Sequence, residues 1–265
     1  MGGIGPSGLG RAGTGRSPGT AGGGGVGGAG CSPGSAGGGV VHVSMPAFVP
    51  VRPWPASFGG TMCARPAGML LTGGASRRMG FDKAMIDVGG VPNALRLAGA
   101  LGQVAGPLVE VGPGRSGLPA VSEEPPGAGP LVALCAGWDA LVACGCAGPV
   151  LVVACDLAFV TAEALAVLSG WPGVSSALPV VGGRPQPLCA RWSQADMEVA
   201  RELVVAGERS MKALLARAAV EMLSEVVWPG DPRRVFADVD TPQDLRRFGL
   251  ACPGAPGRQS AERTG

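Results

Sequence analysis

Short apolar runs alternate with stretches of helical periodicity from about residue 67 to residue 250. The apolar runs are bounded by Gly, Pro or polar residues and predict strands at 68–72, 107–111, 118–122, 149–154, 175–181, 186–191 and 221–227. The periodic stretches predict helices at 92–104, 129–144, 161–169, 194–206, 209–217 and 241–248. Because strands and helices alternate, we expect an α/β fold with a mostly parallel sheet and helices on both faces.

Three of the predicted helices begin with start signals. Pro92 suits a first helical turn. Thr161 is an expected N-cap, with Glu163 in the first turn that follows. Thr241 opens the last helix in the same way, with Asp244 in its first turn.

The two ends of the chain lack this alternation. Of 48 glycines, 19 lie in the first 40 positions, and residues 1–65 contain few bulky apolar side chains. Such a segment buries too little apolar surface to offset the entropy of the chain. We therefore interpret 1–65 as a disordered extension or a wrongly assigned start, 66–250 as the folded domain, and 251–265 as a flexible tail.

The composition excludes several classes of chemistry. The single histidine is His42, outside the predicted domain, so histidine metal sites and histidine general bases are not expected within it. The eight cysteines form no CxxC pair, and most lie in apolar runs, so we expect buried free thiols. No signal peptide or membrane-length apolar run is evident. The net charge of +2 is no argument about nucleic acid in either direction; we expect a cytoplasmic protein with neither a nucleic acid nor a membrane as partner.

A cradle for a nucleoside triphosphate is predicted where the first strand ends. The segment 68–86 reads GMLLTGGASRRMGFDKAMI, and its strand opens into Gly73-Gly74. Paired glycines let a backbone approach a ligand and turn its N–H groups toward it. Arg78 and Lys83 lie just beyond and suit a polyphosphate. Open α/β sheets bind ligands at this end of a strand, so we expect the nucleotide to contact Leu71, Thr72, Gly73 and Gly74.

Acidic residues at the ends of later strands suggest a metal and a base contact. Asp156 follows four apolar residues, where Mg²⁺ could join a carboxylate to phosphate oxygens; a turn or cap aspartate is the alternative. Asp240 is a weaker second ligand, for which a turn or cap role is equally good. The pair Glu123-Glu124 offers carboxylates that can accept from N1–H and N2–H₂ of guanine, or that simply end a strand in solvent.

The segment 71–83 resembles the signature L-A-G-G-x-S-x-R-M-G-x-D-K of the molybdenum cofactor guanylyltransferases, within the wider family of Rossmann-like nucleotidyltransferases. Only Thr72 departs from it, in place of a smaller residue. Further segments resemble later elements of the family in the same order: GAGPLVALCAGW (127–138), LVVACDLAFV (151–160), GRPQPLCARW (183–192) and FADVDTPQDL (236–245). The likeness spans about 67–248.

The resemblance implies a three-layer Rossmann-like nucleotidyltransferase fold with a mostly parallel central sheet. It also implies transfer of GMP from GTP to molybdopterin, with Mg²⁺ and release of pyrophosphate. Arg78, Lys83 and Asp156 are then the catalytic residues, and Asp156 with Asp240 holds the metal. Glu124 aligns with a family aspartate and becomes the nucleotide contact. Arg184, Gln186 and Arg191 could receive a pterin phosphate, although a solvated edge explains them as well.

Three alternatives remain open at this point. The family's Asn after its second strand has no counterpart in 109–117, so a CTP-dependent sister enzyme is one rival. Gly73-Gly74 and the segment 184–188 favour GTP over CTP. A transferase with another phosphorylated acceptor and a nucleotide-binding module without turnover are the others. Molybdoenzymes or their chaperones are possible protein partners of the guanylyltransferase.

Overall fold

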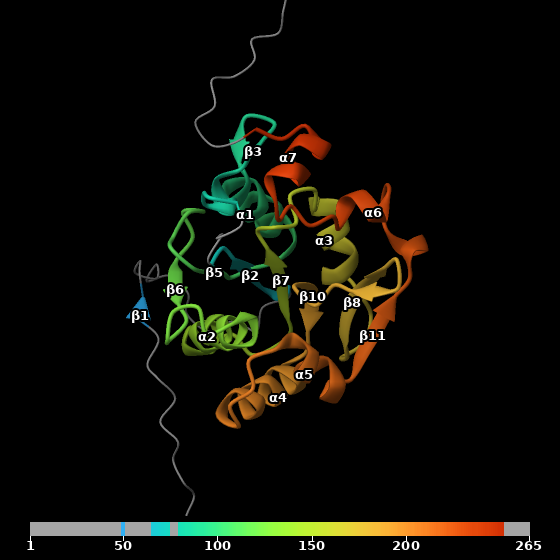
Figure 1. Cartoon of the computed structure of the whole chain (residues 1–265). Helices are drawn as coiled ribbons and strands as arrows, with labels where there is room; N and C mark the ends of the chain where they lie inside the picture. Colours follow the sequence, from blue (N-terminus) through green and yellow to red (C-terminus); the bar gives the residue numbers. More distant parts are fainter. Residues whose placement is uncertain (1–48, 51–64, 75–78, 252–265) are drawn as a thin grey trace, which may run out of the picture. The chain divides into compact units, whose positions relative to one another are not determined.

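A mixed β-sheet runs through the centre of the computed structural model, which describes residues 49–50, 65–74 and 79–251 (Figure 1). The strand order is β1-β6-β5-β2-β7-β10-β8-β11, and β9 pairs with β8. Strands β6, β5, β2 and β7 are parallel, β8 and β11 are parallel, and β10 is antiparallel to both β7 and β8. The strands are β1 Val49–Pro50, β2 Ala67–Leu71, β5 Leu108–Val111, β6 Ala120–Ser122, β7 Val150–Ala154, β8 Ser176–Val181, β9 Arg184–Pro185, β10 Cys189–Trp192 and β11 Val220–Leu223; β3 Asp87–Val88 and β4 Val91–Pro92 form a separate hairpin.

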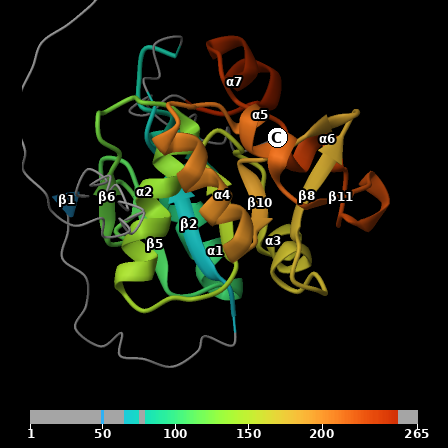
Figure 2. The same cartoon turned by 90° about the horizontal axis from the view of Figure 1, so that it is seen from below.

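Helices cover both faces of this sheet. The helices are α1 Asn93–Val104, α2 Pro130–Ala143, α3 Ala162–Ser169, α4 Gln194–Val205, α5 Met211–Arg217, α6 Pro232–Val235 and α7 Pro242–Phe248, with short 3₁₀ turns η1 Lys83–Met85 and η2 Glu225–Val227. One apolar cluster joins the sheet to α2, α4 and α5, and a second joins it to α1 and α3. Figures 1 and 2 show these two groups of helices on opposite sides of the strands. The predicted three-layer α/β architecture is confirmed.

Strand β2 illustrates why the central strands read as continuous apolar runs. Met69 packs in the first cluster and Leu70 in the second, and neither is exposed to solvent. A strand covered on both faces needs apolar residues at every position rather than at alternate ones. Trp138 and Trp192 are also completely buried in the first cluster, where they serve as packing residues.

The caps predicted from sequence are present at two helices. The Thr161 hydroxyl accepts a hydrogen bond from the backbone N–H of Ala164 at 3.3 Å. Thr241 and Asp244 form a complete capping box at the start of α7. Pro92 differs from the prediction, because it pairs in β4 and precedes the helix instead of occupying its first turn.

Two predicted strands have a limit that differs by three residues or more from the structure. The run 221–227 forms a strand only to Leu223, because the chain then turns at Ser224 into η2. Val226 is 90% exposed there, so its apolar character reflects no burial. The run 186–191 forms β10, which begins later and ends at Trp192.

Residues 1–48, 51–64 and 252–265 lie outside the described residues, so the interpretations of 1–65 and 251–265 stay predictions. Within 1–65, the structure does describe Val49–Pro50, the short strand β1, which pairs antiparallel with β6. In the described part of the chain, no helix is long and apolar enough to cross a membrane. Cys135, Cys155 and Cys189 are buried as expected, and burial raises the pKa of each thiol to about 12.

Candidate active site

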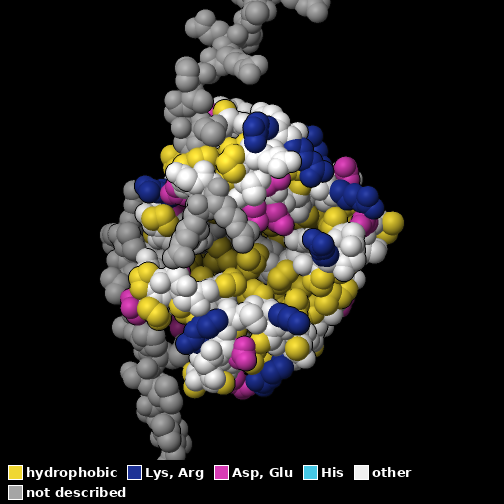
Figure 3. Space-filling view, in the orientation of Figure 1, with side chains coloured by type: hydrophobic (Ala, Val, Ile, Leu, Met, Phe, Trp, Pro, Cys, Tyr) yellow, Lys and Arg dark blue, Asp and Glu magenta, His cyan; other side chains and the backbone are white. Residues whose placement is uncertain are grey.

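A cleft of about 580 Å³ opens where the neighbouring parallel strands β2 and β7 end. This volume falls within the range of small-molecule sites. Figure 3 shows a hollow with apolar side chains in its floor and acidic side chains along its upper margin. Six of the predicted nucleotide-binding and catalytic residues line the cleft: Leu71, Thr72, Gly73, Gly74, Lys83 and Asp156.

Lys83 reaches the cleft from the turn η1. Asp82 caps this turn, since its Oδ1 accepts a hydrogen bond from the backbone N–H of Ala84 at 3.0 Å. The Lys83 ammonium forms an ion pair with the Asp240 carboxylate. The lysine is therefore fixed in the cleft by the turn that carries it and by an acid distant in sequence.

Asp156 lies in a loop that helix α1 holds in place. Asn93, at the start of α1, is fully buried and donates from Nδ2 to the carbonyl of Cys155 at 2.7 Å. One turn later, Arg96 donates to two further carbonyls of the loop, at 2.6 and 2.7 Å. These bonds satisfy the polar backbone of the loop after β7 and direct Asp156 toward the cleft.

A small apolar cluster brings the separate charged segments together. The backbone N–H of Val239 donates to the carbonyl of Asp156 at 2.9 Å, which places Asp238 and Asp240 beside the loop after β7. The residues of this cluster come from the Lys83, Asp156 and 238–240 segments and from α7: Met79, Ile86, Ala158, Val239 and Leu245. Apolar packing thus holds like charges near one another.

Two carboxyl groups beside Lys83 have raised pKa values. Asp156 is only partly exposed, and burial raises its pKa to about 6; the neighbouring Asp238 adds to the rise, while Lys83 opposes it. Burial and the charge of Asp240 likewise raise the pKa of Asp238. Asp238 was not among the predicted site residues. The pattern Asp-x-Asp at 238–240 was the available signal, since alternate residues of an extended segment point the same way.

The glycine loop differs in one respect from the prediction. The backbone N–H groups of Thr72 and Gly73 both donate to the carbonyl of Val111, each at 3.0 Å. The expectation that paired glycines turn their N–H groups toward a ligand is therefore wrong for Gly73. Gly74 has a φ of +127°, a conformation that favours glycine. Arg78 lies outside the described residues, so its role stays a prediction.

Glu123, not Glu124, faces the cleft. Glu123 is buried, and its Oε1 accepts from the backbone N–H of Gly127 at 3.0 Å. Its carboxylate also lies against Gly73, where an added Cβ would be 3.5 Å from Oε2. Glu124, the predicted base contact, is exposed and does not line the cleft. Successive residues of an extended chain point in opposite directions, so a shift of one position changes which acid enters the site.

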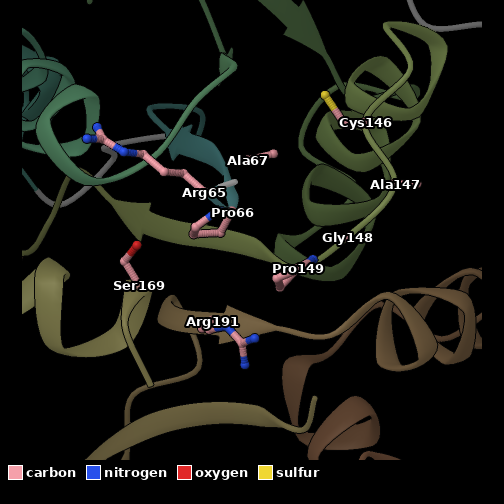
Figure 4. A pocket seen from close by; sticks show the side chains of 9 residues that line it. All are labelled: Arg65, Pro66, Ala67, Cys146, Ala147, Gly148, Pro149, Ser169 and Arg191. Carbon is pink, nitrogen blue, oxygen red and sulfur yellow. The ribbon is translucent and has the colours of Figure 1, made fainter. Parts of the chain in front are cut away.

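Arg191 lies at the opposite edge of the sheet, beside a second cavity of about 240 Å³ (Figure 4). It is buried and donates to the carbonyls of Ser175 at 2.8 Å and Gly173 at 3.1 Å. Its suggested contact with a pterin phosphate is therefore wrong for an acceptor in the cleft. Arg184 is exposed in β9, near enough to Asp238 to oppose the rise in the pKa of that acid.

The donor set of the cleft fits a hard cation. Among the described residues there is no group of three His, Cys, Asp or Glu side chains arranged to hold a metal by themselves. Mg²⁺, however, is commonly bound by one or two carboxylates together with phosphate oxygens. Asp156, with Asp238 and Asp240 nearby, supplies such carboxylates beside Lys83.

A mostly parallel sheet with a charged cleft at its carboxyl edge defines an α/β nucleotide-binding protein. The sequence matches the MobA-like NTP transferase domain over residues 68–223, and the chain belongs to that family. This confirms the resemblance seen in the signature segments.

Similar proteins agree with this assignment. The chain is 33% identical over 187 residues to a probable molybdenum cofactor guanylyltransferase of Pelotomaculum thermopropionicum, covering 67% of this chain and 89% of the relative. It is 32% identical over 189 residues to the molybdenum cofactor guanylyltransferase of Rhodobacter capsulatus, covering 69% and 94%. The crystal structure of molybdopterin-guanine dinucleotide biosynthesis protein A from Archaeoglobus fulgidus has a TM-score of 0.56 at 22% identity, covering 68% of this chain and 95% of the other; that likeness shows the fold.

Proposed function

We propose that this protein transfers GMP from GTP to a terminal phosphate of molybdopterin and releases pyrophosphate. The observation that carries the proposal is that Lys83 and Asp156 line one cleft, at the ends of β2 and β7. The choice of guanine as the base of the nucleotide, and of the molybdenum cofactor as the acceptor, follows from the names of the relatives.

The charges around the cleft support a cation-dependent triphosphate site. Three carboxylates, Asp156, Asp238 and Asp240, influence one another there, with Lys83 beside them. A bare triphosphate would be repelled by this surplus of negative charge. Asp156 with Asp238 or Asp240 would hold Mg²⁺, which when bound would neutralise charge on the phosphates.

The reaction needs no general base from the protein. An oxygen of the acceptor phosphate, already anionic, forms a new bond to the α-phosphorus of GTP. The bond from that phosphorus to the oxygen bridging to the β-phosphate breaks, and pyrophosphate leaves with the electron pair. Lys83 would neutralise the β- and γ-phosphates and the leaving group, a role that we also propose for Arg78. Catalysis then rests on alignment and on fixed charge.

The nucleoside would lie against the loop 71–74 and Glu123. Glu123 takes the role predicted for Glu124, because of these two acids only Glu123 lines the cleft. Its carboxylate can accept from N1–H and N2–H₂ of guanine, and this pair of donors is absent from adenine and cytosine. On the other side, Arg184 near Asp238 is placed to attract an anionic acceptor. A cytoplasmic location and contact with molybdoenzymes or their chaperones remain parts of this proposal.

Pyrophosphate release tests the proposed reaction. The purified protein is incubated with Mg²⁺ and each of the four common NTPs, and in separate reactions with molybdopterin or with another phosphorylated acceptor. We expect pyrophosphate with GTP and molybdopterin together. Release with CTP instead would identify the sister activity, and release only with another phosphorylated acceptor would change the acceptor. GTP binding without pyrophosphate under any of these conditions would indicate a binding module.

A further inference from the structure

Glu110 is a fully buried acid at the end of the sheet next to the glycine loop. It lies in β5, and its relative exposure is 0%. Its Oε1 accepts from the Thr72 hydroxyl at 2.5 Å and from the backbone N–H groups of Gly114 and Arg115 at 2.8 Å each. Its Oε2 accepts from the backbone N–H of Ser116 at 2.8 Å and from the Ser116 hydroxyl at 2.5 Å. One carboxylate therefore organises two separate loops.

These hydrogen bonds keep the buried acid ionised. Burial alone would raise the pKa of Glu110, but hydrogen bonds from Ser116, Thr72 and the backbone outweigh it and hold the pKa below its usual range. A buried carboxylate is tolerated only when it is satisfied in this way. Hydrogen bonds to an ionised acceptor are also stronger than those between neutral groups.

The contact with Thr72 reinforces a close approach between the two loops. The backbone N–H groups of Thr72 and Gly73 already donate to the carbonyl of Val111, the residue after Glu110. Gly112 has a φ of +145°, and a Cβ there would lie 2.3 Å from the Thr72 hydroxyl oxygen and 2.6 Å from the Gly73 nitrogen. No larger residue fits at 112, so the glycine loop rests directly on the end of β5.

The loop gathered by Glu110 also reaches the turn that carries Lys83. Arg115 donates from Nε to Asp82 Oδ2 at 2.8 Å. The other oxygen of Asp82 caps η1, in which Lys83 is the first residue. Glu110 is thus connected to both sides of the triphosphate cradle, to Thr72 by a direct bond and to the Lys83 turn through Arg115 and Asp82.

We infer that Glu110 is a positioning residue for the nucleotide, acting through the Thr72 hydroxyl and the loop 112–117. Its carboxylate holds the loop 71–74 at the distance from Lys83 that a triphosphate requires. The inference rests on the proposed function, because it concerns the same nucleotide site. The hydroxyl is a feature of this chain, since Thr72 stands where the resembling signature has a smaller residue.

Thr72→Val tests this inference with little change in volume, and Thr72→Ser keeps the hydroxyl. The dissociation constant for GTP with Mg²⁺ is measured by calorimetry, alongside the urea midpoint of each variant. We expect Thr72→Val to weaken GTP binding about tenfold, the scale of one lost hydrogen bond to a charged group. Thr72→Ser should stay within about threefold of the wild type, since it restores the donor.

Ser169→Ala is the matched control. The Ser169 hydroxyl donates to the carbonyl of Val104 at 2.7 Å and lies beside the cavity at the opposite edge of the sheet (Figure 4). Its loss should lower stability and leave GTP binding unchanged. The urea midpoints show whether each variant is fully folded under the binding conditions. Between fully folded variants, a change in the dissociation constant reports positioning rather than general destabilisation.

The outcomes distinguish the inference from the proposed function. If the Thr72→Val variant is less stable but binds GTP as tightly as the wild type, the inference is overturned and the proposed function is unaffected. A wild type that prefers another NTP would revise the function, and weaker binding of that NTP by Thr72→Val would still support the inference. If Thr72→Val does not fold, Arg115→Ala breaks the exposed contact to Asp82 and should weaken binding about threefold. Unchanged binding by that variant would count against the inference.

Discussion

Two carboxylates at the same edge of the sheet, Glu110 and Asp156, are treated in opposite ways. Glu110 accepts five hydrogen bonds from the protein, and its pKa is held below the usual range. Asp156 faces Asp238 and Asp240 as well as Lys83, and its pKa is raised to about 6. The protein satisfies the first acid completely and leaves the second close to like charges. The first arrangement holds loops in place, and the second favours a cation that arrives with the substrate.

The largest effect is expected from removing the charges that face the cleft. Asp156→Ala and Lys83→Ala should each lower turnover at least ~10²-fold, the scale for one preorganised electrostatic group. The measurement is the steady-state rate of pyrophosphate release. Glu163→Ala, an exposed acid in α3, is the control and should retain normal turnover. Near-normal activity in either site variant would refute its assigned role.

Glu110→Gln should lower the stability of the protein, which tests whether Glu110 is the fully satisfied acid of the two. The amide keeps the size of the side chain but places an NH₂ group against backbone donors, so we expect a loss of about 2–4 kcal/mol in the free energy of unfolding. Urea unfolding measures it, with the exposed Glu124→Gln as a control expected to change stability by less than about 0.5 kcal/mol. A Glu110→Gln variant as stable as the wild type would show that the five hydrogen bonds contribute little.

In the absence of metal, Asp156→Asn should increase the free energy of unfolding, whereas Glu110→Gln should decrease it. A pKa raised from 3.8 to about 6 means that ionised Asp156 destabilises the folded state, so the amide should add about 1–3 kcal/mol of stability above pH 6. The gain should shrink as the pH falls from about 6 toward 4, because Asp156 of the folded state then takes up a proton, and it should vanish below about pH 4, where the unfolded-state carboxyl is protonated as well. Urea unfolding in EDTA at pH 5 and at pH 7.5 measures this difference. A gain that is absent at pH 7.5, or larger at pH 5, would contradict the account that burial, with repulsion from Asp238 and Asp240, raises the pKa of Asp156.

The sequence predicted the fold well where local signals and burial agreed. The apolar runs at 68–72 and 149–154 are strands covered on both faces, and Thr161 and Thr241 cap the helices that they precede. Strand limits were less accurate where apolar residues continued past a turn, as at 221–227. An apolar side chain can be buried, but whether it is buried depends on where the backbone turns.

The site was predictable in its main residues but not in its details. Lys83 is the last residue of the signature segment 71–83, and Asp156 follows the apolar run of a predicted strand. The structure brings both residues to one cleft. The choice between Glu123 and Glu124 depends on which way a side chain leaves an extended segment, which a single sequence does not fix. Glu110 lies within the predicted strand 107–111 and was assigned no role, because its partners at 72 and 114–116 meet it only in the folded protein.

The most direct test of the account is GTP binding with and without Mg²⁺, measured by calorimetry for the wild type and Asp156→Asn. We predict that Mg²⁺ tightens binding to the wild type at least ~10-fold and has little effect on the variant, because the carboxylate that would share the ion is gone. Equal enhancement by Mg²⁺ in both proteins would contradict the central claim that Asp156 meets a magnesium-bound triphosphate across the cleft from the glycine loop.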